Sequence, residues 1–249
     1  MAIRHKDGLF QSSSDTIGSS MTTDIRTNNT RTALLDLIAT LSFKLGDFTL
    51  ASGQRSDYYI DCRTTTLHAE GGRLAGIALY ELIREQIPTA VAVGGLTMGA
   101  DPLVSNTASA SAWALAEYNE IRDLSRELEL GEEDSESAPP LIHGFLVRKA
   151  EKKHGTGRRI EGFLQQGVQV VIVDDVCTTG GSTVTAIEAT REAGMVVAGV
   201  LCLVDREQSG RDAIERALAE VPSDEDVPFF SLYTASDVRK AHLALAAKK

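Results

Sequence analysis

The most constraining feature of the chain is the segment at residues 171–183, which reads VIVDDVCTTGGST. An apolar strand ends there in two consecutive carboxylates, and a loop rich in Thr, Gly and Ser then opens directly into a helix. Open α/β sheets bind ligands outside the carboxyl ends of their strands. Glycines let the backbone approach an anion, and the N–H groups at a helix N-terminus favour negative charge. The segment therefore predicts a phosphate site at residues 177–183.

Asp174 and Asp175 narrow the expected ligand to a phosphorylated sugar. Neighbouring carboxylates accept hydrogen bonds from vicinal sugar hydroxyls and help to hold a hydrated Mg²⁺. No Gly-Lys-Ser/Thr follows the loop and no G-x-G-x-x-G occurs, which disfavours nucleotide hydrolysis and hydride transfer. The alternative is purely structural, with the aspartates capping the helix at Ser182 and the glycines forming a turn. The complete order of strand, acidic pair and loop favours the ligand site.

Strands and helices alternate along most of the chain. The apolar pattern predicts strands at 89–93, 141–147, 167–173, 195–204 and 228–233. Helices are expected at 74–83, 102–118, 182–193, 211–219 and from 236. Ahead of them, a helix from Arg31 is expected to end at Gly46, and β-prone pieces at 47–51 and 58–62 suit a hairpin. The alternation predicts an α/β fold with a mainly parallel central sheet flanked by helices.

Composition changes sharply in three places. Residues 1–30 are polar, electrically neutral and without apolar periodicity, so we expect a flexible N-terminal extension, within which Met21 is an alternative start. Residues 31–249 then form one domain, interrupted by an acidic insertion at about 117–140. Residues 117–136 carry a net charge of −7, typical of a solvated helix extension and loop. Residues 148–159 carry +5 and two glycines, which predicts a mobile basic loop.

The global composition limits the partners and the compartment. A net charge of −10 disfavours a general affinity for nucleic acid or anionic membranes. No apolar run is long enough for a membrane span or a signal peptide. Cys62, Cys177 and Cys202 are far apart and odd in number, which fits buried thiols better than disulfides or zinc ligands. We therefore expect a cytoplasmic protein.

The segment at 171–183 resembles the phosphoribosyl pyrophosphate signature of the type I phosphoribosyltransferases. Three further pieces resemble orotate phosphoribosyltransferases: FTLASG at 48–53 followed by SDYY at 56–59, RKAEKKHG at 148–155, and VDR at 204–206. The resemblance covers about residues 31–240 and implies the type I phosphoribosyltransferase fold with a small N-terminal hood. It also implies a glycosyltransferase of pyrimidine biosynthesis. This enzyme would transfer the phosphoribosyl group, with Mg²⁺, from 5-phosphoribosyl 1-pyrophosphate to orotate, giving orotidine 5′-monophosphate and pyrophosphate.

The resemblance further implies a role for each matching residue. Asp174 and Asp175 would bind the ribose hydroxyls and, together with the substrate, Mg²⁺. The residues implied at the 5′-phosphate are Val176, Cys177, Thr178, Thr179, Gly180, Gly181 and Ser182. Thr178 and Arg206 would contact orotate, since the guanidinium fork suits a carboxylate.

The basic loop at 148–159 is implied to act across a subunit boundary. In the resembling family such a loop closes over the pyrophosphate of the neighbouring subunit, so an active homodimer is expected. The matching residues in this chain are Arg148, Lys149, Lys152 and His154. Of these, Lys152 would act as a catalytic cation together with the acidic pair.

Two positions depart from the family pattern. Many members carry a lysine that helps to bind pyrophosphate where this chain has Ala51, and another where it has Met98. Arg55 or the basic loop is the expected compensation. One alternative function is a phosphoribosyltransferase for another base, which explains residues 174–183 but not the basic loop together with Arg206. The other is a non-catalytic regulator that senses phosphoribosyl pyrophosphate, for which a basic nucleic-acid-binding surface would be expected.

Overall fold

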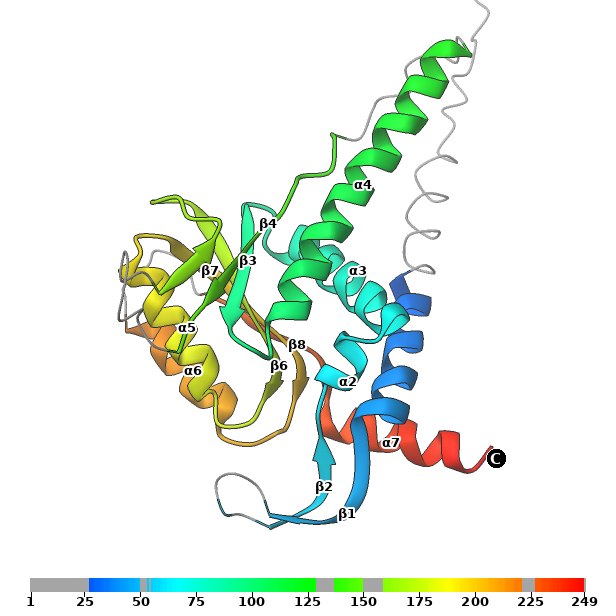
Figure 1. The fold of residues 1–249 in the computed structure, drawn as a ribbon, viewed down its shortest axis with the longest axis vertical. Coiled ribbons are helices and arrows are strands. Elements are labelled where there is room, and N and C mark those ends of the chain that lie inside the picture. Colours follow the sequence, from blue (N-terminus) through cyan, green and yellow to red (C-terminus); the bar gives the residue numbers. More distant parts are fainter. Residues whose placement is uncertain are drawn as a thin grey trace, which may run out of the picture.

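A computed structural model describes residues 27–49, 53, 55–128, 137–149, 159–220 and 227–248. Its centre is a six-stranded sheet with the order β5-β4-β3-β6-β7-β8 (Figure 1). The strands are β3 (Ala92–Leu96), β4 (His143–Val147), β5 (Ile160–Gly162), β6 (Gln169–Cys177), β7 (Val196–Asp205) and β8 (Phe229–Thr234). All neighbours pair in parallel except β4 and β5. The predicted α/β fold with a mainly parallel sheet is confirmed.

Both faces of the sheet are covered by helices. Figure 1 shows α3 (Ala69–Gln86) and α4 (Asp101–Glu127) on one side, and α5 (Gly181–Glu192) and α6 (Gly210–Ala219) on the other. Successive side chains of a strand point to opposite faces. Accordingly, Val171 and Val173 of β6 belong to the core under α3 and α4, whereas Val170 and Ile172 belong to the core under α5 and α6. This double burial explains the unbroken apolar run of the strand.

A smaller unit, here called the hood, is built from both ends of the described chain. It contains a helix at 27–37, η1 (Ile38–Ser42), the antiparallel hairpin β1 (Phe43–Thr49) and β2 (Arg55–Ile60), α2 (Arg63–Thr66) and α7 (Ala235–Ala246). Within the hood, His242 Nδ1 of α7 lies 2.7 Å from the Ala39 carbonyl. The Tyr233 hydroxyl of β8 donates to the Arg31 carbonyl and so joins the sheet to the hood. The hairpin extends away from the sheet at the lower edge of Figure 1.

Several predicted boundaries were wrong. The first helix already includes residues 27–30, and Gly46 lies inside β1 rather than ending that helix. Gly94 lies inside β3, where the Phe145 ring occupies the space that a side chain would need. β6 continues through the two aspartates to Cys177, because its pairing with β7 runs as far as Cys177 opposite Asp205. The short elements α2 and β5 carried no periodic signal long enough to predict them.

The three unusual segments are described only in part. Residues 117–127 of the acidic insertion form a mostly exposed continuation of α4, which extends beyond the sheet in Figure 1. Residues 1–26, 129–136 and 150–158 lie outside the described part of the chain. The three cysteines are buried and free, as expected. Among the described helices, none combines the length and apolar character needed to cross a membrane.

Candidate active site

A cavity of about 930 Å³ opens where the carboxyl ends of β3, β4, β6 and β7 meet the hood hairpin. Its lining residues come from six parts of the chain. They are Tyr59, Ile60, Asp61 and Arg63; Leu96, Thr97, Met98 and Gly99; Leu146, Arg148 and Lys149; Glu161; Asp174, Asp175, Val176, Thr178 and Ser182; and Arg206. This is the edge at which parallel α/β sheets bind ligands. The cavity therefore unites the predicted acidic pair, part of the predicted phosphate loop and Arg206.

Burial disfavours the ionised form of the carboxyl groups of Asp174 and Asp175. Asp174 is only 8% exposed, and its carboxylate accepts hydrogen bonds from the Thr183 hydroxyl at 2.7 Å and the Asp175 N–H at 3.0 Å. Burial, followed by the charge of Asp175, raises the pKa of Asp174 to about 7. Burial also raises the pKa of Asp175. A pair of this kind gains from hydroxyl donors or a cation, because either stabilises its ionised form.

The loop between β6 and α5 depends on a glycine. Gly180 has a φ of 77°, and a Cβ there would lie 2.7 Å from the Gly210 carbonyl oxygen. A left-handed residue at this point turns the chain sharply into α5. Thr178 and Ser182 line the cavity on either side of the turn, whereas Thr179, Gly180 and Gly181 are not among its lining residues. The loop thus offers two hydroxyls beside a helix N-terminus.

Cys177 does not reach the cavity with its polar groups. Its side chain is fully buried in the core under α5 and α6. Its N–H donates to the Cys202 sulfur at 3.1 Å, and its carbonyl accepts the Arg206 N–H at 2.9 Å. Cys177 therefore connects the predicted phosphate loop to the end of β7, next to Arg206, and its side chain does not line the cavity.

Arg206 is a buried cation in the cavity wall. Its guanidinium is centred 4.7 Å over the Tyr58 ring, and Nη2 donates to the Ser56 hydroxyl at 3.3 Å. The residue is 6% exposed, and its Nε is buried with no hydrogen-bond partner among the described residues. No described carboxylate forms an ion pair with it. An uncompensated buried charge is costly, so this arrangement fits an anionic ligand.

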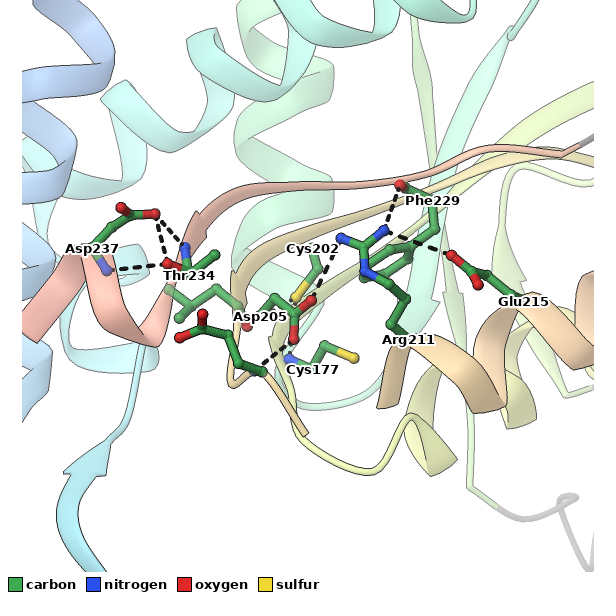
Figure 2. A network of polar contacts seen from close by, with 10 residues as sticks. Cys177, Cys202, Asp205, Arg211, Glu215, Phe229, Thr234 and Asp237 are labelled. Carbon is green, nitrogen blue, oxygen red and sulfur yellow. Dashed lines mark hydrogen bonds and ion pairs between the residues drawn. The ribbon is translucent and has the colours of Figure 1, made fainter. Parts of the chain in front are cut away.

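A network of polar contacts around Asp205, the residue before Arg206, stabilises this turn. Figure 2 shows the network. The Asp205 carboxylate accepts the Glu207 N–H at 2.9 Å and pairs with Arg211 at 3.5 Å. Arg211 in turn lies over the Phe229 ring, with its guanidinium carbon 4.4 Å from the ring centroid. Glu207, in the left-handed region with a φ of 57°, accepts the Ser236 N–H at the start of α7. Contacts from α6, β8 and α7 therefore fix the backbone beside the cavity.

Only some of the residues predicted to bind pyrophosphate belong to the described part of the chain. Arg148 and Lys149 line the cavity at the end of β4, and Arg148 pairs with Glu161 at 3.1 Å. Lys152 and His154 lie outside the described residues, as does Ala51. Arg55, one expected compensation for the missing lysines, pairs instead with Asp47 across the hairpin and does not line the cavity.

Three charged cavity residues, Asp61, Arg63 and Glu161, had no role in the sequence analysis, and Tyr59 entered it only in the SDYY piece at 56–59. Tyr59 alternates with Tyr58 along β2, so the two rings point to opposite sides. Tyr58 packs on Phe43 with ring centroids 5.5 Å apart, which leaves Tyr59 for the cavity. Two neighbouring tyrosines in a strand predict that one ring points away from the core. The sequence around them does not indicate which of the two it is, or that it faces this cavity.

The acidic pair suits a cation that the ligand itself helps to hold. Within the described residues, no group of three or more His, Cys, Asp or Glu side chains could hold a metal ion. Mg²⁺ usually keeps several waters and binds through one or two carboxylates together with substrate phosphates. Asp174 and Asp175 match that limited protein contribution.

Comparison with known proteins gives consistent matches. The phosphoribosyl transferase domain family matches residues 145–231. The orotate phosphoribosyltransferase of Aquifex aeolicus is 39% identical over 211 residues, covering 84% of this chain and 97% of the relative. A structure of Mycobacterium tuberculosis orotate phosphoribosyltransferase with Fe(III) dicitrate superimposes with a TM-score of 0.62 at 33% identity, covering 84% of this chain and 98% of that one. The same enzyme in complex with 5-phospho-α-D-ribosyl 1-diphosphate gives a TM-score of 0.59 at 30% identity and the same coverage.

Proposed function

The chain belongs to the orotate phosphoribosyltransferases, and on that premise we propose that its cavity transfers the phosphoribosyl group of 5-phosphoribosyl 1-pyrophosphate to orotate. The products are orotidine 5′-monophosphate and pyrophosphate. One observation carries the proposal: the acidic pair with its Thr/Gly/Ser loop and a buried, unpaired guanidinium share a single cavity. The first suits a phosphorylated ribose and the second a planar carboxylate.

The phosphoribosyl end is assigned to β6 and α5. Asp174 and Asp175 accept hydrogen bonds from the two ribose hydroxyls, which favours the ionised form of both carboxyl groups. Thr178 and Ser182 donate to the 5′-phosphate, beside the backbone N–H groups that begin α5. Gly180 keeps this loop in its turn.

The base end is assigned to Arg206, with Thr178 beside it. Orotate brings a carboxylate that pairs with the buried guanidinium, whereas a purine or uracil leaves the charge without a counter-ion. This difference favours orotate over the alternative of another base. The cost of an unpaired buried charge makes it a means of substrate selection.

The reaction separates charge along the C1–oxygen bond of the sugar. As that bond breaks, pyrophosphate takes the electron pair, the ribose ring becomes positive, and the orotate ring nitrogen attacks C1. Asp174 and Asp175 would hold Mg²⁺ together with the diphosphate, and the cation would supply positive charge to the leaving group. Arg148 and Lys149 supply positive charge at the cavity wall, and preorganised cations stabilise developing negative charge without reorganisation.

The active form is proposed to be a homodimer in the cytoplasm. Lys152 and His154 of one subunit would complete the pyrophosphate end of the partner's cavity, and closure of their loop would exclude water from the reacting centre. Support comes from the match of residues 148–155 to the family loop and from the free, buried cysteines, which suit a reducing compartment.

A parallel substrate assay tests the proposed function. Purified full-length protein is supplied with Mg²⁺, 5-phosphoribosyl 1-pyrophosphate and, separately, orotate, uracil, adenine or hypoxanthine. We expect turnover of orotate and little of the other bases. Turnover of a purine base but not of orotate would contradict the proposed specificity. If none of the bases is turned over, the result would favour the alternative of a non-catalytic regulator that senses phosphoribosyl pyrophosphate.

A further inference from the structure

Arg63 is a cation of the cavity wall that none of the roles above uses. It begins α2, directly after the hood hairpin, and lines the same cavity as the acidic pair. Asp61 holds it: the Asp61 carboxylate accepts hydrogen bonds from Nε and Nη2 of Arg63, both at 2.8 Å, and from its backbone N–H at 3.1 Å. No described residue accepts a hydrogen bond from Nη1. The guanidinium is thus oriented by one carboxylate and retains an unused donor edge.

Arg63 is electrostatically coupled to the ribose-binding carboxylates. Burial raises the pKa of Asp175, and the positive charge of Arg63 works against that rise. The backbone at Gly99 packs so closely on the Asp175 carboxylate that a Cβ there would collide with it. Arg63, Gly99 and the 69% exposed Met98 therefore border the same part of the cavity as Asp175.

The proposed function already assigns a substrate group to two other parts of the cavity. The loop at 178–182 suits the 5′-phosphate, and Arg206 with Ser56 and Tyr58 suits the carboxylate of the base. The wall with Arg63 beside Asp175 has no assigned ligand, and only Arg148 and Lys149 have so far been assigned to the C1 substituent of a ribose held by the acidic pair. That substituent is the diphosphate, the most highly charged group of the substrate.

We propose that Arg63, oriented by Asp61, binds the diphosphate of 5-phosphoribosyl 1-pyrophosphate. The inference rests on the proposed function. A charge-assisted hydrogen bond from a preoriented guanidinium to a diphosphate oxygen requires little reordering of the side chain. The opposing interpretation is that the Asp61–Arg63 pair only stabilises the turn before α2, and the two differ in what Arg63 variants do to pyrophosphate binding.

The main test is Arg63→Gln, which keeps a polar side chain able to donate to Asp61. Isothermal titration with magnesium pyrophosphate as the probe measures its affinity, and steady-state kinetics give KM for each substrate. We expect pyrophosphate affinity to fall, and KM for the phosphoribosyl donor to rise, by roughly 10- to 100-fold. KM for orotate should change less than about threefold. Pyrophosphate affinity within about twofold of wild type, or an equal loss for orotate, would overturn the proposal.

Arg73→Ala is a matched control. Arg73 pairs with Glu70 through the same two guanidinium nitrogens, at 2.9 and 2.6 Å, but lies on α3 outside the cavity. It should leave pyrophosphate affinity unchanged, whatever it does to the melting temperature. A similar loss in Arg73→Ala and Arg63→Gln would contradict a specific role for Arg63.

A charge-replacement variant separates charge from turn stability. Met98→Lys in the Arg63→Gln background returns a cation to the same wall without restoring the Asp61 pair. We expect it to recover at least about threefold of the lost pyrophosphate affinity, and no recovery would contradict the proposal. The wild-type protein serves as the reference throughout. If it does not turn over orotate, the proposed function is wrong. If it turns over orotate and Arg63→Gln leaves pyrophosphate affinity unchanged, only the inference about Arg63 is wrong.

Discussion

Arg206 is a buried arginine with no carboxylate partner among the described residues, and we propose that it determines which base this cavity accepts. Arg206 is held against Tyr58 and Ser56, and its Nε has no acceptor among the described residues. Its turn is fixed by Asp205 and Arg211 (Figure 2). The guanidinium is therefore preorganised for a ligand that brings its own negative charge, and the energetic cost of leaving it unpaired falls on every neutral base.

Substitution of Arg206 should relax this selection. For Arg206→Ala we expect KM for orotate to rise about 10- to 100-fold, because hydrogen bonds to charged groups contribute roughly 1.5–3 kcal/mol. KM for the phosphoribosyl donor should change little, since Arg206 is assigned to the base. The preference for orotate over uracil, measured as the ratio of kcat/KM values, should shrink with it. Arg216→Ala, an exposed arginine on α6, is the control; an undiminished preference in Arg206→Ala would contradict the assignment.

The acidic pair should make the unliganded protein less stable as the pH rises. The pKa of Asp174 is raised from its ordinary value of 3.8 to about 7, so the folded state binds a proton that the unfolded state releases. The contribution of this group to the free energy of unfolding falls by on the order of 1.4 kcal/mol per pH unit between those values. Asp174→Asn removes the titration. The melting temperature of Asp174→Asn relative to wild type should therefore increase from pH 5 to pH 8, and parallel melting curves would argue against the raised pKa.

At the scale of elements, the connection from β6 into α5 positions the two hydroxyls that we propose bind the phosphate. Its geometry depends on the left-handed Gly180, which packs against the carbonyl of Gly210 at the start of α6. The same helix N-terminus lies beside the sulfur of Cys177. The loop is therefore braced by α6 from behind while Thr178 and Ser182 face the cavity.

Gly180→Ala tests this brace. The added Cβ would clash with the Gly210 carbonyl in a strained backbone, so we expect a loss of about 1–3 kcal/mol in the free energy of unfolding and weaker binding of the phosphoribosyl donor. Gly167→Ala is the matched control, because Gly167 has a similar φ of 75° but open space around it. It should cost about 1 kcal/mol from backbone strain alone and leave donor binding intact. Equal effects in chemical denaturation and in KM would contradict a special role for Gly180.

At the scale of the whole molecule, the cavity is formed between the sheet and the hood. The sheet supplies the acidic pair, the phosphate loop and Arg206, while the hairpin and α2 supply Tyr59, Asp61 and Arg63. The hydrogen bond from the Tyr233 hydroxyl of β8 to the Arg31 carbonyl ties the hood to the sheet, and the contact of His242 with the Ala39 carbonyl holds α7 within the hood. The remaining wall, in our proposal, comes from the basic loop of a second subunit.

Mixed dimers test that shared site. Lys152→Ala and Asp174→Asn should each have little activity alone. A mixed dimer of the two contains one intact site if the loop acts on its partner, so an equimolar mixture that exchanges subunits should regain about a quarter of wild-type activity. Mixing Lys152→Ala with the double variant should regain none, because no dimer then holds an intact site. Absence of recovery in the first mixture, with exchange verified, would contradict action across the interface.

The sequence by itself determined the fold class, and it predicted the residues of the phosphate end of the site. Both follow from short-range patterns: alternating strands and helices, and one uninterrupted strand, acidic pair and loop at 171–183. Element ends were less predictable. β6 runs to Cys177 because β7 continues to pair with it, and long-range pairing of this kind is invisible in local composition. Tyr59 faces the cavity because Tyr58 packs on Phe43.

Only the tertiary structure decided which distant side chains share the cavity and in what state. Cys177 belongs to a phosphate-loop motif, yet strand alternation turns its thiol into the core. Arg55 was one expected compensation for the missing lysines, but it pairs with Asp47 in the hairpin and does not line the cavity. Arg63 belongs to no recognised motif. It lines the same cavity as the acidic pair because the hairpin brings the chain back to this edge of the sheet. The sequence specifies the type of each ionisable side chain, whereas tertiary packing decides how far that side chain is exposed to water and which group it pairs with.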